Sequence, residues 1–150
     1  MAKSYVPDYE PARQKALELT EGLKTQQEKF DAITKWLNKF ITYDYIRATH
    51  IKELTGPDVA RCYEKREGIC MDVSCLAALM FRTVGIRTRI VFGTVQMTDY
   101  RGTFAPSWHA WTEVIVDGKK FFYDQVAEHR NRNKVKTRIT FTYKVTIYRE

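Results

Sequence analysis

The sequence has few cysteines, prolines and glycines and no long hydrophobic run. Its 150 residues include three cysteines, four prolines and seven glycines, and no apolar stretch reaches the roughly 20 residues that a transmembrane helix needs. No internal repeat, low-complexity tract or Gly/Ser-rich linker divides the chain. With 44% hydrophobic and 13% aromatic residues, the composition is that of an ordinary globular protein. We therefore expect a single domain over residues 1–150 with no membrane span.

The cysteines and histidines lack the spacing of a disulfide framework or a metal site. Cys62, Cys70 and Cys75 are odd in number, so at least one thiol is free or pairs with another chain. No CxxC pair occurs, and none of the three histidines has metal-ligand spacing to another histidine or to a cysteine. No Asp/Asn-rich loop resembles a calcium site. The sequence therefore predicts neither a disulfide scaffold nor a bound metal.

The net charge of +7 is concentrated in one basic segment, residues 129–138. This segment, HRNRNKVKTR, contains five Lys or Arg residues and no acid. Such a run is most simply a solvated loop, and the alternative is a contact with polyanions or an acidic surface. Because no aromatic residue interrupts the run to stack on bases, nucleic-acid binding is weakly supported.

The hydrophobic pattern changes from a helical period to a strand period near the middle of the chain. Helices are expected over residues 11–21, 26–41, 58–67 and 70–82. Thr25 and Glu28 have the spacing of a capping box, Gly22 and Gly85 mark helix ends, and Trp36 falls on a broad apolar face that is expected in the core. Strands are expected over residues 86–97, 108–116, 119–126 and 139–148, with a polar loop at 98–107. Helices followed by a meander of antiparallel strands predict an α+β fold.

Cys70 is the cysteine best placed for chemistry. It opens the helix expected over residues 70–82, so its sulfur would lie near the positive end of the helix dipole, which favours the nucleophilic thiolate. Gly68 would let a substrate backbone approach, and the Cys70 N–H is a natural donor to an oxyanion. The alternative for Cys70 is a buried apolar residue. Cys75 points about 140° away around the helix, and Cys62 and Cys75 are both assigned to packing.

The hairpin around Asp117-Gly118 brings a histidine and a carboxylate together. A two-residue turn there pairs Trp111 with Asp124 and His109 with Val126. His109 and Trp111 share a face, so Asp124 lies diagonally opposite His109, about 7–8 Å away at the backbone and within reach of its ring. A carboxylate there would orient the imidazole and stabilise its protonated form while the other ring nitrogen faces the thiol. The alternatives are a half-buried strand histidine and a strand-end aspartate that bonds to backbone.

The motifs carrying these residues resemble the transglutaminase-like superfamily over residues 28–126. They are Gly68-Ile69-Cys70-Met71-Asp72, a helix ending in Gly85-Ile86, Arg89-Ile-Val-Phe-Gly93, His109-Ala110-Trp111 with Glu113-Val114, and Phe122-Tyr123-Asp124. The resemblance implies a papain-like arrangement, in which N-terminal helices include a nucleophile helix that packs on a C-terminal antiparallel sheet. It implies Cys70 as nucleophile, His109 as general base and acid, and Asp124 as the residue that orients His109. Gln125-Val126-Ala127 departs from the family pattern and is expected to alter the substrate-side rim.

Three classes of function follow from these residues. The first is a thiol enzyme that acts on protein or peptide amides through a thioester, without a metal or organic cofactor. Hydrolysis would make it a protease or amidase, and attack by an amine a transglutaminase; the residues leave both open, with a slight preference for hydrolysis because a small domain excludes little water. The second is a catalytically silent binding or scaffold module. The third is a polyanion binder that uses residues 129–138.

The compartment stays open at the level of sequence. The N-terminus has no continuous apolar segment of the kind found in signal peptides, which fits a cytosolic protein or a mature fragment with an added Met1. The resemblance implies bacterial relatives, many of them secreted or attached to the cell surface.

Overall fold

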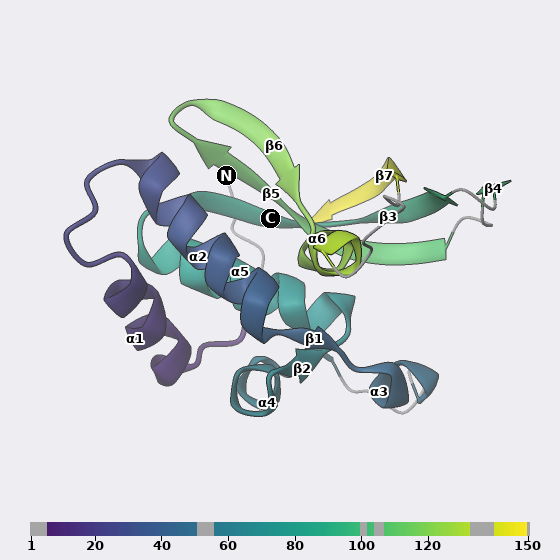
Figure 1. Ribbon diagram of the computed structural model, residues 1–150, viewed down its shortest axis with the longest axis horizontal. Coiled ribbons are helices and arrows are strands. Elements are labelled where there is room, and N and C mark those ends of the chain that lie inside the picture. Colours follow the sequence, from purple (N-terminus) through teal and green to yellow (C-terminus); the bar gives the residue numbers. More distant parts are fainter. Residues whose placement is uncertain (1–5, 51–55, 100–101, 104–106, 133–139, 150) are drawn as a thin grey trace.

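The computed structural model describes residues 6–50, 56–99, 102–103, 107–132 and 140–149. Its helices lie mainly on one side of an antiparallel sheet, as Figure 1 shows. The helices are α1 Glu10–Leu19, α2 Gln26–Phe40, α3 Tyr45–Thr49, α4 Val59–Lys65, α5 Cys70–Thr83 and α6 Gln125–Arg132. The strands are β1 Thr42–Tyr43, β2 Glu67–Gly68, β3 Arg87–Asp99, β4 Gly102–Thr103, β5 Ser107–Val116, β6 Lys119–Tyr123 and β7 Thr140–Arg149. The predicted α+β class is confirmed.

Local signals set the helix boundaries. The capping box before α2 is formed, because the Glu28 N–H donates to Thr25 Oγ1 at 3.1 Å and the Thr25 N–H donates to Glu28 Oε1 at 3.2 Å. Gly22 and Gly85 follow α1 and α5 with φ of +77° and +87°, a conformation that costs glycine little. The helices expected over residues 11–21, 26–41 and 70–82 are therefore confirmed to within about two residues.

Helix α5 lies in the core, between α1 and α2 on one side and the sheet on the other. Ten consecutive residues from Asp72 to Phe81 are buried, so this helix is enclosed around most of its circumference. Trp36 on α2 is 8% exposed, which confirms its place in the core.

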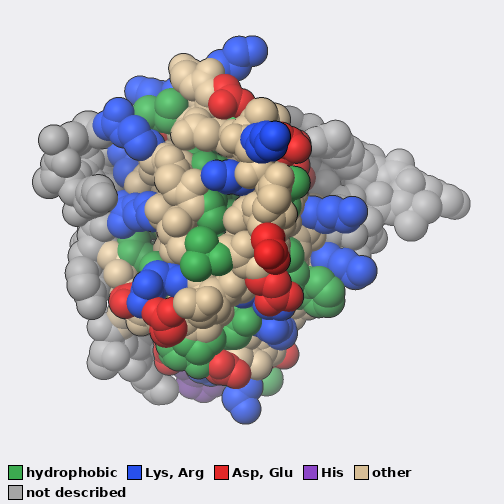
Figure 2. Space-filling view, turned by 90° about the vertical axis from the view of Figure 1, so that its left-hand side faces the viewer, with side chains coloured by type: hydrophobic (Ala, Val, Ile, Leu, Met, Phe, Trp, Pro, Cys, Tyr) green, Lys and Arg blue, Asp and Glu red, His purple; other side chains and the backbone are tan. Residues whose placement is uncertain are grey.

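The face shown in Figure 2 carries charged side chains of both signs. Lys and Arg side chains gather toward the upper left, and over the rest of this face Asp and Glu side chains are mixed with Lys and Arg.

The sheet confirms the predicted hairpin and corrects the predicted strand order. Asp117 and Gly118 have φ of +49° and +80°, as a type I′ turn requires. Thr112 pairs with Tyr123 and Val116 with Lys119, which is the register predicted for this hairpin. The order is β4-β3-β5-β6, and β7 pairs with β3. The expected meander is therefore wrong for the last strand, which pairs with β3, on the edge of β3 opposite β5, rather than with β6.

The strand expected over residues 119–126 ends early, at Tyr123. The Asp124 carboxylate accepts the N–H groups of Val126 and Ala127 at 3.1 and 3.4 Å, and these bonds turn the chain into α6. Consequently Val126 does not pair with His109, although Asp124 keeps its place at the end of the hairpin.

Two expected loops also differ from the structure. Within residues 98–107, β3 continues to Asp99 and pairs with β4, while residues 100–101 and 104–106 lie outside the described residues. In the basic segment 129–138, residues 129–132 belong to α6 rather than to a loop, and 133–138 lie outside the described residues.

A short parallel pairing positions the segment before Cys70. Thr42 pairs with Glu67 and Tyr43 with Gly68, joining β1 to β2. The Asp44 N–H then donates to the Gly68 carbonyl at 3.0 Å. This ladder ties the region that follows α2 to the start of α5.

Candidate active site

Cys70 is the first residue of α5 and is partly exposed, whereas Cys62 and Cys75 are 0% and 3% exposed. Burial raises the pKa of the Cys62 thiol, which keeps it protonated and unreactive. The packing roles predicted for Cys62 and Cys75 are confirmed by their burial. Cys70 is thus the cysteine that solvent and a substrate can reach.

The start of α5 is held by Asp72, whose side chain is 1% exposed. Its carboxylate accepts the N–H groups of Ile69 at 3.0 Å and Asp58 at 2.9 Å, and it pairs with the Arg47 guanidinium at 2.9 Å. One buried anion therefore joins α3, the start of α4 and the residue before Cys70. The sequence motif contained Asp72 without assigning it a role; an acid in the first turn of a helix was the available signal.

Close packing around position 68 requires a glycine there, which the sequence did not indicate. A Cβ at this buried position would lie 2.8 Å from Cys62 Sγ and 2.9 Å from Asp72 Cβ. The absence of a side chain thus allows close internal packing at the start of α5, and the role of Gly68 in admitting a substrate backbone stays a prediction.

His109 and Asp124 meet in a short hydrogen bond. His109 Nε2 lies 2.7 Å from Asp124 Oδ2, and the two side chains are 10% and 4% exposed. His109 comes from β5 and Asp124 from the residue after β6, so the hairpin register brings them together, as predicted. Since Asp124 occupies Nε2, Nδ1 is the ring nitrogen left for Cys70.

The electrostatics of His109 reflect both partners. Burial favours the neutral ring and lowers its pKa, but hydrogen bonds with Asp124 and then with Cys70 raise it, and the result is a pKa of about 10. His109 is therefore an imidazolium at neutral pH. A cationic ring in hydrogen-bonding contact with a sulfur stabilises the thiolate, the form that acts as a nucleophile. The structure thus brings Cys70, His109 and Asp124 into one cluster.

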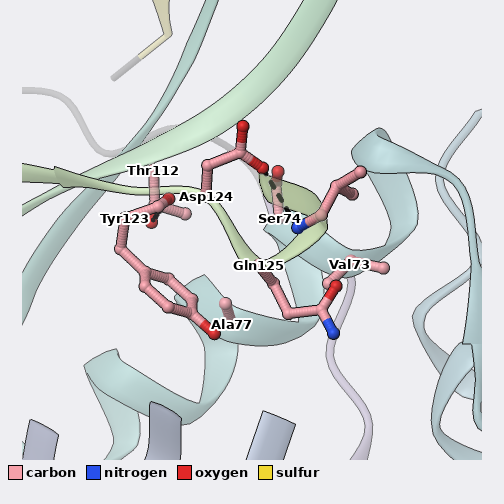
Figure 3. Close-up of a pocket in the computed structure, with 8 residues that line it drawn as sticks. Val73, Ser74, Ala77, Thr112, Tyr123, Asp124 and Gln125 are labelled. Carbon is pink, nitrogen blue, oxygen red and sulfur yellow. Dashed lines mark hydrogen bonds between the residues drawn. The ribbon is translucent and has the colours of Figure 1, made fainter. Parts of the chain in front are cut away.

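Asp124 is held from four directions. Oδ1 accepts the N–H groups of Val126 and Ala127, while Oδ2 accepts from His109 and from the Tyr143 hydroxyl at 3.0 Å. Figure 3 shows the bond from the start of α6 to the carboxylate, beside a narrow crevice. The crevice is lined by Val73, Ser74, Ala77, Thr112, Tyr123, Asp124, Gln125 and Val126. These four hydrogen bonds fix the orientation of the carboxylate.

Tyr143 is a contact of the site that the sequence did not reveal. Its ring lies 4.9 Å from Trp111 and 5.9 Å from Phe122 between centroids. The alternation of residues 139–148 predicted a strand but not its neighbour, so nothing in the sequence indicated that Tyr143 reaches Asp124.

The segment Gln125-Val126-Ala127, which was expected at the substrate-side rim of the site, is buried. Its three residues are 5%, 7% and 7% exposed, and Gln125 Nε2 donates to the carbonyls of Leu37 and Ile41 at 3.0 and 2.8 Å. The departure from the family pattern therefore fastens the start of α6 to the last carbonyls of α2 and its C-cap.

The described residues contain neither a metal-binding cluster nor a membrane-spanning helix. No group of three or more His, Cys, Asp or Glu side chains in that part of the chain is arranged to bind a metal ion. No helix found there has the length and hydropathy needed to cross a membrane.

The chain belongs to the transglutaminase-like superfamily, whose family profile matches residues 13–124. The superfamily includes cysteine-nucleophile enzymes. A comparison with curated proteins found no match.

Three solved structures share the fold. A structure described as a TGase has a TM-score of 0.56 and 22% identity, over 77% of this chain and 30% of that one. A "putative protease" from Parabacteroides distasonis has a TM-score of 0.56 and 17% identity, over 77% and 23%. A "putative cysteine protease" from Cytophaga hutchinsonii has a TM-score of 0.60 and 16% identity, over 93% and 49%. The matches thus span less than half the length of each of these proteins.

Proposed function

We propose that the protein is a cysteine-nucleophile acyl-transfer enzyme that acts on amide or peptide carbonyls of a protein or peptide substrate. Cys70 is the nucleophile, His109 is the general base and acid, and Asp124 orients His109. The observation that carries this proposal is the environment of His109, which is hydrogen-bonded to both Asp124 and Cys70 and has a pKa of about 10 despite its burial.

The first half of the reaction forms a thioester. The Cys70 thiolate attacks the amide carbonyl carbon, and the resulting oxyanion is stabilised by the Cys70 N–H and the positive end of α5. The His109 imidazolium then gives its proton to the departing amine as the C–N bond breaks. The acyl group remains bonded to the sulfur, and His109 is left neutral.

The second half returns the enzyme to its starting state. Neutral His109 takes a proton from water or an amine, which attacks the thioester carbonyl, and the Cys70 thiolate leaves beside the restored imidazolium. We propose that water is the usual acceptor, which makes the protein a protease or amidase. The support for this choice is that Cys70 is partly exposed on a small domain, where little surface is available to exclude water.

The chemistry of Cys70 is tested with iodoacetamide at pH 6, where an ordinary thiol with a pKa near 8.5 reacts slowly. We expect selective labelling of Cys70, detected by mass spectrometry, and its loss in H109A. Cys75 is the internal control because it is buried on the same helix. Equal slowness at all three cysteines would instead support a catalytically silent scaffold.

The choice of acceptor is tested with casein and a fluorescent amine. We expect cleaved casein peptides from the wild-type protein and none from C70A. Amine-labelled or cross-linked casein in place of cleavage would replace hydrolysis with transamidation while leaving the thioester step intact. Untouched casein together with unreactive Cys70 would remove the enzymatic proposal.

A further inference from the structure

The oxygen of Asp124 that faces His109 has a second donor. Asp124 Oδ2 accepts both from His109 Nε2 at 2.7 Å and from the Tyr143 hydroxyl at 3.0 Å. The other oxygen, Oδ1, is held by two backbone N–H groups of α6. The orientation of the carboxylate is thus fixed by two backbone groups at Oδ1 and, at Oδ2, by Tyr143 in addition to His109.

Tyr143 reaches this oxygen because of the strand order. It lies on β7 and pairs with Val95 of β3, and β3 also pairs with β5, which carries His109. The match to the superfamily profile ends at Asp124, so β7 is a part of this chain beyond the matched region. The hydroxyl therefore comes from a strand that the family comparison does not cover.

The Tyr143 ring is held independently of its hydroxyl. It packs on Trp111, the residue two positions after His109 on the same face of β5, with centroids 4.9 Å apart. The rings of Trp111 and His109 in turn stack with centroids 5.9 Å apart. A phenylalanine at position 143 would keep these ring contacts and remove only the donor, which separates packing from hydrogen bonding.

We propose that Tyr143 is a positioning residue for the reaction, donating from β7 to Asp124 Oδ2 so that this oxygen stays directed at His109. This inference rests on the proposed function, since it concerns how the Cys70–His109 pair is kept ready. Without the hydroxyl, Oδ2 loses one of its two donors, and only the two bonds to Oδ1 and the bond from His109 still hold the carboxylate. The His109 imidazolium is then less well stabilised, and with it the Cys70 thiolate.

The test compares iodoacetamide labelling of Cys70 in Y143F at pH 6 and pH 9. At pH 9 an ordinary thiol ionises without help, so only the pH 6 rate depends on the imidazolium. We expect Y143F to lower the pH 6 rate by about 3-fold to 10-fold and the pH 9 rate by less than about 2-fold, as fits the loss of one hydrogen bond to a charged group. A merely structural role would not change the ratio of the two rates.

Tyr123→Phe is the matched control. Tyr123 is a buried tyrosine whose hydroxyl, like that of the partly buried Tyr143, is hydrogen-bonded, but it donates to Asn38 Oδ1 at 2.6 Å rather than to Asp124. Y123F should keep the wild-type ratio of pH 6 to pH 9 rates, even if its melting temperature falls. A ratio in Y143F equal to that in Y123F overturns the proposal for Tyr143.

A double-mutant cycle with D124N gives a second, independent result. If Tyr143 acts through Asp124, Y143F should change the pH 6 rate by less than about 2-fold once Asp124 is replaced, because the two effects are not additive. Full additivity overturns the proposal. Should D124N fail to fold, the rate ratio of Y143F against Y123F decides alone. Unchanged labelling in H109A, by contrast, would count against the proposed function itself.

Discussion

The Arg47 guanidinium donates two hydrogen bonds to the Asp72 carboxylate, from Nε at 2.9 Å and from Nη2 at 3.2 Å. Arg47 lies on α3 and Asp72 in the first turn of α5, so this pair joins two elements that are 25 residues apart in sequence. The hydrogen bonds that Arg47 donates to Asp72 also raise the pKa of Arg47. Helix α5 thus begins at a largely buried ion pair rather than at a free end.

Asp72→Ala should destabilise the protein strongly, because it leaves Arg47 and the Ile69 N–H without their partner. Breaking a buried ion pair in this way costs about 3–5 kcal/mol, and urea denaturation measures the change. Asp8→Ala is the control, since Asp8 pairs with Arg13 at an exposed site and should cost about 1 kcal/mol or less. A similar loss in both variants would show that Asp72 does not organise the start of α5.

The protonation of His109 should depend strongly on Asp124. The wild-type ring is expected to titrate near pH 10, and in D124N it should titrate at lower pH because burial then acts without the carboxylate. Ring chemical shifts followed by NMR between pH 5 and pH 11 measure both, with H109Q identifying the signal. An unchanged midpoint in D124N would contradict the assigned role of the carboxylate.

Protonation of the His109 ring should also make the free energy of unfolding depend on pH. Its pKa of about 10 in the folded state lies above the unfolded value of about 6.5. Its contribution to the free energy of unfolding is therefore fully present below about pH 6.5 and is lost as the pH rises toward 10. In H109Q this part of the decline between pH 6.5 and pH 10 should disappear, as urea denaturation across that range would reveal.

The parts of the fold that local patterns control were predictable from the sequence. Thr25 and Glu28 marked the start of α2, and Asp117-Gly118 set the hairpin register that places Asp124 near His109. These features depend on backbone groups only a few residues apart, so the local sequence contains the information.

Contacts between distant segments were not predictable in the same way. Nothing local to residues 139–148 specifies that β7 pairs with β3, so the bond from Tyr143 to Asp124 could not be foreseen. The end of β6 depended on Asp124 capping α6 and on Gln125 reaching the carbonyls of α2. The requirement for a glycine at position 68 likewise depends on Cys62, which packs against it.

Gly68→Ala should destabilise the protein because the new methyl group meets atoms on two sides. Cys62 Sγ would lie 2.8 Å away and Asp72 Cβ 2.9 Å away, and overpacking of this kind typically costs about 1–3 kcal/mol. Adding Cys62→Ala removes the sulfur contact, so the double variant should lose less stability than the sum of the two single variants. Strict additivity in urea denaturation would show that Cys62 is not the obstacle.

Gln125→Ala should loosen the junction between α2 and α6, because the buried Ile41 carbonyl loses its side-chain donor, while the Leu37 carbonyl keeps only the Ile41 N–H. An unpaired buried group costs about 1–3 kcal/mol, so the free energy of unfolding in urea should fall by about that amount. Gln27→Ala is the matched control, since Gln27 bonds to Asp31 at an exposed site. If both variants unfold alike, Gln125 does not fasten these helices, and the position of the neighbouring Asp124 must depend on the hairpin alone.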